Sequence, residues 1–296
     1  MLHLNALLAL AAAFLWGGGD FSGGMGAKNA GGTMGGALRV ILTSHAASFT
    51  VLVAIARWRG DAFPHGAPLA WGIAAGVTGG IALACFYVAL SRGAMGASAA
   101  LSGLLAAAIP AVVSVIGEGS PGLLRITGFL VAGVAIWLIA AGPNAEARSA
   151  DAGTIWLAVA AGIGFGIYFV ALKMAGVAGV IWPMATARIG SLSICSLILV
   201  GLSLSPKTSK ASEIAKGRLT RTAVRWALTT ALLDTSGNLL FIAATRAGRL
   251  DVAAVLASLY PASTILLAAW MLSERPTRRQ GLGMAVAAAA VVMITL

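Results

Sequence analysis

The chain has 296 residues, of which 59% are hydrophobic and only 10% are charged, whereas an ordinary soluble domain carries about 25% charged residues. Its mean hydropathy is +0.93, and a soluble globule has too little polar surface to cover so many apolar side chains. Composition therefore excludes a cytosolic enzyme and a disordered chain. The net charge is +11, but the basic residues lie in small groups between apolar runs, as in membrane-protein loops rather than in a nucleic-acid-binding stripe.

The chain contains a series of apolar windows that are each long enough to cross a bilayer, which takes about 20 mostly apolar residues. We therefore predict an all-α membrane protein of the plasma membrane with ten transmembrane helices, embedded in lipid and with no obligate protein or nucleic-acid partner. In chain order the windows are 4–24, 37–56, 69–90, 95–116, 123–141, 153–173, 183–203, 223–245, 251–272 and 279–296.

Small residues are abundant, with 38 glycines in the chain, and they let helices approach closely in lipid. In the third window Gly72, Gly76 and Gly80 are spaced by four and share one helix face. We expect this face to pack closely against another helix.

The two halves of the chain resemble each other. Trp71 and Trp226 are 155 residues apart, Arg92 and Arg246 are 154 apart, and Glu118 and Glu274 are 156 apart. We therefore predict two repeats of five helices, residues 1–142 and 153–296. Because each repeat has an odd number of helices, the second copy enters the membrane inverted, which is typical of alternating-access transporters with a midplane site.

Several segments carry a family resemblance that extends over nearly the whole chain. The sequence resembles the EamA family of the drug/metabolite transporter superfamily. This resemblance implies two inverted repeats and the export or exchange of small metabolites, without naming a substrate. The segments that carry it are Trp16-Gly-Gly-Gly-Asp20-Phe-Ser-Gly-Gly24, Tyr87-Val-Ala-Leu-Ser-Arg-Gly93, Gly117-Glu118, Asp234-Thr-Ser-Gly-Asn238 and Ser258-Leu-Tyr-Pro-Ala-Ser-Thr264.

Ionisable residues inside membrane windows are costly, so each marks a candidate functional site. Asp234 lies deep in the eighth window, and Thr230, Asp234 and Asn238 share one helix face. Asp234 either binds a cationic group or carries a coupling proton, or it acts as a structural polar clasp. Asp20, near the end of the first window, is the second coupling candidate, with a structural pair to Arg39 as the alternative.

Aromatic residues are the remaining candidates for a substrate cavity, because aromatic walls bind organic solutes by area and by cation–π contact. The alternative for Trp16, Tyr87, Tyr168 and Tyr260 is simple packing or interfacial anchoring. Pro110 and Pro261 lie inside apolar windows, where each removes a backbone hydrogen bond, and they are the predicted hinges.

The sequence thus predicts a secondary transporter of a small organic metabolite, and not an enzyme. Its driving force is either a proton gradient, through Asp234 or Asp20, or facilitated exchange. It contains no phosphate-binding loop, no His-Glu-x-x-His and no Cys-x-x-Cys, so we expect no cofactor and no metal. The alternative function is a membrane-embedded enzyme that acts on a lipid. Orientation is left open, since the loop charges favour an external N-terminus and the family resemblance implies an internal one.

Overall fold

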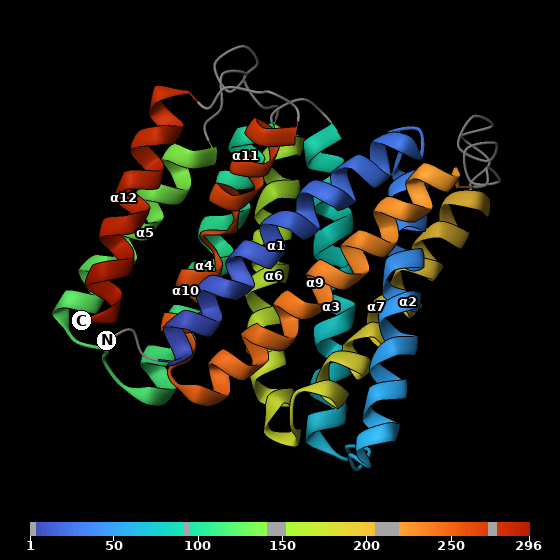
Figure 1. Cartoon of the computed structure of the whole chain (residues 1–296), viewed down its shortest axis with the longest axis horizontal. Helices are drawn as coiled ribbons and strands as arrows, with labels where there is room; N and C mark the ends of the chain where they lie inside the picture. The colour runs from blue at the N-terminus through green and yellow to red at the C-terminus, as the bar shows by residue number, and fades with distance from the viewer. Residues whose placement is uncertain (1–3, 92–94, 141–151, 205–218, 272–276) are drawn as a thin grey trace.

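The computed structural model describes residues 4–91, 95–140, 152–204, 219–271 and 277–296 (Figure 1). The regular secondary structure in these ranges is helical. In the first half the helices are α1 (Leu4–Asn29), α2 (Met34–Arg59), α3 (Ala67–Ser91), α4 (Met95–Glu118) and α5 (Leu123–Ala140). In the second half they are α6 (Ala152–Ala175), the short turn η1 (Gly176–Ala178), α7 (Ile181–Leu204), α9 (Arg221–Ala247), α10 (Leu250–Ala257), α11 (Tyr260–Met271) and α12 (Arg278–Thr295).

Seven of these helices are long and apolar enough to cross a membrane: α1, α2, α3, α4, α6, α7 and α9. Large apolar side chains also cover much of the molecular surface; Ile116 is 81% exposed and Trp156 is 70% exposed. A water-soluble monomer rarely exposes so much contiguous apolar surface. The chain is an all-helical, multi-pass membrane protein, as its composition predicts.

Several helix ends are capped by polar residues, because the backbone N–H groups of the first turn have no hydrogen-bond partner within the helix. The side chains of Thr33 and Thr220 each accept a hydrogen bond from a backbone N–H in the first turn of α2 and α9. Thr277 and Gln280 form a reciprocal capping box at the start of α12. Gly60 ends α2 in the left-handed region at φ 69°, which glycine adopts without steric cost.

One expected helix differs in the structure. The ninth window, residues 251–272, is not a single helix, because the chain turns at Ser258 and Leu259 between α10 and α11. Pro261 is the second residue of α11, where its missing N–H costs little. Pro110 lies inside α4, and that helix continues through it.

The helices of the two halves interleave. α1 packs along α9, α3 packs along both α6 and α7, α4 packs on α6, and α10 and α11 pack on α1. At one end of the molecule α5 pairs with α12, and at the other end α2 pairs with α7 (Figure 1).

The glycine face of α3 packs against α7, as its spacing predicts. A Cβ atom on Gly76 would lie 1.8 Å from the carbonyl oxygen of Ala187, and one on Gly72 would lie 2.0 Å from Oγ1 of Thr186. From the opposite helix, a Cβ on Gly190 would lie 2.2 Å from the carbonyl oxygen of Ile73. Only glycine permits this backbone approach, which brings α7 beside the centre of the molecule.

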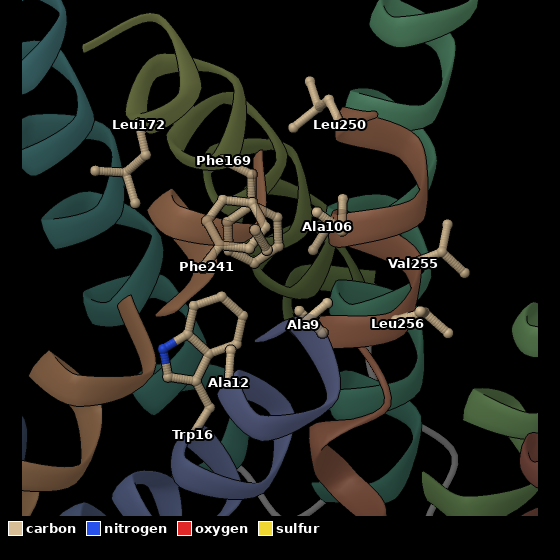
Figure 2. Close-up of a cluster of buried hydrophobic side chains, with 14 of the residues drawn as sticks. Ala9, Ala12, Trp16, Ala106, Phe169, Leu172, Phe241, Leu250, Val255 and Leu256 are labelled. Atoms are coloured by element: carbon tan, nitrogen blue, oxygen red, sulfur yellow. The ribbon is translucent and has the colours of Figure 1, made fainter. Parts of the chain in front are cut away.

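An aromatic cluster joins the halves in the core (Figure 2). Trp16 of α1 stacks on Phe169 of α6 with ring centroids 5.2 Å apart and planes 4° from parallel. Phe241 of α9 lies 4.8 Å from the Phe169 ring and is fully buried. Buried alanines such as Ala9 and Ala12 pack beside these rings, so the cluster fixes one wall of the interior.

Candidate functional site

A cavity of about 110 Å³ lies among the helices of both halves, which is room for several water molecules. Its wall combines small residues, aromatic rings and a few charged groups. The lining residues are Trp16, Asp20, His45, Gly76, Gly79, Gly80, Leu83, Phe86, Ala106, Phe165, Tyr168, Phe169, Met184, Ala187, Arg188, Ser191, Asp234, Asn238 and Tyr260.

The structure brings together six of the seven residues that the sequence nominated for substrate binding. Both coupling candidates are among them. The six that line the cavity are Trp16, Asp20, Tyr168, Asp234, Asn238 and Tyr260. The seventh, Tyr87, has a side chain that lies outside the described part of the structure.

The polar face of α9 points inward as the spacing of four predicts. Asp234 and Asn238 reach the cavity, whereas Thr230 lies one turn earlier and shares a hydrogen bond of 2.9 Å with the hydroxyl of Ser22 on α1. The Asn238 amide is held from two sides. Its Oδ1 accepts a 2.6 Å hydrogen bond from the Tyr168 hydroxyl, and its Nδ2 donates to the carbonyl oxygen of Asp234 at 2.8 Å.

Arg188 of α7 is the site residue that sequence reasoning missed. Its side chain is only 4% exposed, and it forms an ion pair with Asp234 through Nη2. The signal was present in the sequence, because Arg188 is an ionisable residue inside the apolar window 183–203. The partner of Asp234 is therefore on α7, and Asp234 already has a cation beside it within the protein.

Two hydroxyl groups complete the surroundings of Arg188. Its Nε donates to Oγ of Ser48 at 3.0 Å, and its Nη2 donates to Oγ1 of Thr235 at 3.2 Å. Thr235 in turn donates to Ser48 at 2.6 Å. Buried charges persist when they are paired and hydrogen-bonded, and this network joins α2, α7 and α9 around one guanidinium group.

Asp20 has a different environment from Asp234. It is half-buried at the cavity wall, and it forms no hydrogen bond or ion pair with any residue of the described ranges. The salt bridges of the described residues do not include the alternative pair of Asp20 with Arg39. α1 crosses α9 closely at this point, since a Cβ on Gly19 would lie 3.4 Å from the Cβ of Asp234. Asp20, the next residue along α1, therefore lies beside the turn of α9 that carries Asp234.

His45 of α2 lies at the cavity wall and is 8% exposed. Its Nδ1 is 2.8 Å from Oγ of Ser191, which also donates to the carbonyl oxygen of Arg188 at 3.1 Å. His45 is thus a buried, hydrogen-bonded residue of the cavity wall.

A second polar group, which we name the end cluster, joins helix ends on one face of the molecule. Glu118 at the end of α4 forms an ion pair with Lys173 near the end of α6. Arg249 before α10 pairs with the fully buried Asp251 at 2.7 Å and donates to the carbonyl oxygens of Glu118 and Gly119 at 3.2 and 2.7 Å. Asn5 of α1 donates to the carbonyl oxygen of Arg249 at 3.0 Å.

The end cluster therefore consists of Asn5, Glu118, Lys173, Arg249 and Asp251. It connects α1 and α4 of the first half with α6 and α10 of the second. Nearby, Arg246 donates to the carbonyl oxygen of Gly176. Its counterpart Arg92 and the counterpart of Glu118, Glu274, lie outside the described residues.

The fold and the cavity define a class of protein: a multi-pass helical membrane protein with a charged and aromatic cavity between its two halves. Residues 152–296, the second half of the chain, match the EamA-like transporter family, which confirms the family resemblance in the sequence.

Over the full length, the chain is similar to a solved structure described as "Crystal structure of protein", with a TM-score of 0.75 and 15% sequence identity. That likeness covers 98% of this chain and 96% of the other, and it concerns the fold alone. No curated protein matches the chain.

Proposed function

We propose that this protein is a secondary transporter that exports or exchanges a small organic metabolite across the plasma membrane by alternating access to the described cavity. The observation that carries this proposal is the composition of the cavity wall. It unites Asp20, Arg188 and Asp234 with Trp16 and Tyr260, and these residues come from both halves of a chain in a transporter family. A cavity shared by two halves can open to either side when the halves tilt.

We further propose ten spans arranged as two inverted repeats, α1 to α5 and α6 to α12, with α10 and α11 together as one span. The packing of the helices supports this arrangement. In this arrangement α1, α2, α3 and α5 correspond to α6, α7, α9 and α12. Replacing each helix by its counterpart then converts the α1–α9 packing into the α6–α3 packing, and both packings are present. The same exchange converts α3–α7 into α9–α2 and leaves the α2–α7 and α5–α12 pairs unchanged.

The end cluster is our proposed gate on one face. It holds the two halves together through ion pairs and hydrogen bonds to backbone carbonyl oxygens. Opening of that face requires these contacts to separate, so the end cluster favours the state in which the face is closed. Pro261, beside the break between α10 and α11, and Pro110 in α4 are the proposed hinges.

Of the two coupling candidates, Asp20 is the better carrier of an exchangeable proton. Asp234 is ion-paired with Arg188, and a proton on Asp234 would leave the guanidinium charge without its partner. Asp20 has no such partner among the described residues, so its carboxylate is free to bind a proton or a substrate cation.

Alternating access can be tested without knowledge of the substrate. The background replaces both free cysteines, Cys85 and Cys195, by alanine. Ala187 lines the cavity and is 2% exposed; a cysteine at this position is expected to react with a membrane-impermeant thiol reagent added to either side of oriented membrane vesicles. Ala253→Cys is the matched control, because Ala253 is equally buried in α10 but does not line the cavity. Reaction of Ala187→Cys from one side only would contradict the proposal.

A further inference from the structure

The charges of the cavity do not balance. Arg188 and Asp234 cancel each other as an ion pair, and His45 shares a hydrogen bond with Ser191. Asp20 remains, with neither a cation nor a hydrogen-bond donor against it within the described ranges. The lining therefore carries about one negative charge in excess when both carboxylates are ionised.

Arg188 is not available to an anionic ligand. Its side chain is 4% exposed, and its guanidinium group is hydrogen-bonded to one carboxylate and two hydroxyl groups. A carboxylate entering the cavity would have to displace Asp234 from Arg188, and it would meet Asp20 as a second negative charge. Like charges in a site of low dielectric constant repel strongly, so the described lining disfavours anions.

A zwitterion fits the charges less well than a cation does. Its ammonium group would balance Asp20, but its carboxylate would add a new negative charge that no free cation of the described lining meets. A monovalent cation leaves the cavity electrically neutral. A neutral set of paired charges has the lowest free-energy cost when charges are removed from water.

The rest of the wall favours an organic cation over a metal ion. Trp16, Phe165, Tyr168, Phe169 and Tyr260 contribute aromatic rings, whose faces attract cations and whose area binds apolar groups. Within the described residues, no group of three or more His, Cys, Asp or Glu side chains is close enough to hold a metal ion. Gly79 lets the Tyr168 ring lie close to α3, since a Cβ at this position would be 2.9 Å from that ring.

We infer that the substrate of this cavity is a small monovalent organic cation, an amine attached to an apolar or aromatic body, and that Asp20 is the carboxylate that receives its charge. This inference rests on the proposed transport function, and it assigns different tasks to the two acids. Asp234 orients and neutralises Arg188, whereas Asp20 binds the ligand.

The test uses three probes with the same ring and different charge: phenethylamine, phenylalanine and phenylacetate. Their binding to the full-length protein in lipid nanodiscs is measured by calorimetry at constant pH and ionic strength. We expect phenethylamine to bind at least ten-fold more tightly than the other two. Equal binding of the three probes, no binding of phenethylamine, or a preference for phenylalanine or phenylacetate would overturn the inference.

Variants of Asp20 then test whether this carboxylate receives the positive charge of the ligand. Asp20→Asn is expected to weaken phenethylamine binding at least ten-fold, and Asp20→Glu is expected to restore much of it because the carboxylate returns. Asp61→Asn is the matched control, since it removes a carboxylate that pairs with Arg59 at a helix end, outside the cavity. Unchanged binding in Asp20→Asn, or equal losses in Asp20→Asn and Asp61→Asn, would refute the role of Asp20.

Counterflow of phenethylamine into proteoliposomes separates this inference from the proposed function. Charge-selective binding without counterflow would support the cation site and contradict transport. Counterflow of phenylacetate or phenylalanine in preference to the amine would support transport and overturn the cation site.

Discussion

The Arg188–Asp234 pair allows a quantitative prediction, because the two partners differ in burial. The Arg188 side chain is 4% exposed and that of Asp234 is 30% exposed. Asp234→Asn leaves a buried guanidinium with two hydroxyl partners. Removing one member of a buried pair costs about 3–5 kcal/mol, and we expect about 3 kcal/mol here because Asp20 remains in the same cavity.

Replacing Arg188 is expected to lower the unfolding free energy less than replacing Asp234 does. Arg188→Gln leaves the Asp234 carboxylate, which faces the cavity and can be hydrated there, so the cost is about 1–3 kcal/mol. The double variant removes both charges and retains the Ser48–Thr235 hydrogen bond of 2.6 Å. We expect it to be more stable than Asp234→Asn alone, with a coupling energy of about 1–3 kcal/mol.

The measurement is reversible unfolding of the purified protein in detergent, with increasing dodecyl sulfate and circular dichroism as the readout. All four proteins of the double-mutant cycle are compared under one condition. If the stability losses of the two single variants simply add in the double variant, the coupling of Arg188 and Asp234 is refuted. If Arg188→Gln lowers the unfolding free energy more than Asp234→Asn does, the assigned difference in burial is refuted.

Three further predictions concern packing, the site wall and the gate. Gly76→Ala places a Cβ 1.8 Å from a backbone oxygen and should cost about 1–3 kcal/mol of unfolding free energy, whereas Gly24→Ala, with nothing within 4 Å, should be neutral or stabilising in the same assay. Tyr168→Phe removes a 2.6 Å hydrogen bond and should cost about 1 kcal/mol; no change would mean that the bond is not formed in the membrane. Glu118→Gln breaks the pair with Lys173 and should increase thiol labelling of the cavity from the face of the end cluster, and a decrease would contradict the gate.

Much of the fold follows from the sequence because lipid imposes strong constraints on apolar helices. The windows place nearly all helices, and the spacing of Gly72, Gly76 and Gly80 predicts the close face of α3. The break at Ser258 could not be predicted, because it depends on neighbouring helices that shield the freed backbone groups. Pro261 marks the region, but Pro110 shows that proline alone does not end a helix.

The sequence predicted site residues where a single ionisable side chain is energetically unfavourable inside an apolar window, as for Asp234 and Asp20. The pairing was not predictable, because it depends on which helices lie side by side. A pair of Asp20 with Arg39 was one alternative from their positions along the chain, but α1 crosses α9 at Asp234, and Arg188 of α7 pairs with Asp234. A window scan that treats basic and acidic residues alike would have nominated Arg188.

The short helix α10 has a consequence for how the protein is made. Every one of its eight residues is buried, and at 1.5 Å per residue it is only about 12 Å long, so it cannot cross a bilayer of about 30 Å by itself. We therefore expect α10 and α11 to enter the membrane together, as the single span proposed above. We expect the turn at Ser258 to form once α1 and α4, which pack on α10, surround its polar backbone, so that assembly of this region is completed inside the membrane among helices synthesised earlier.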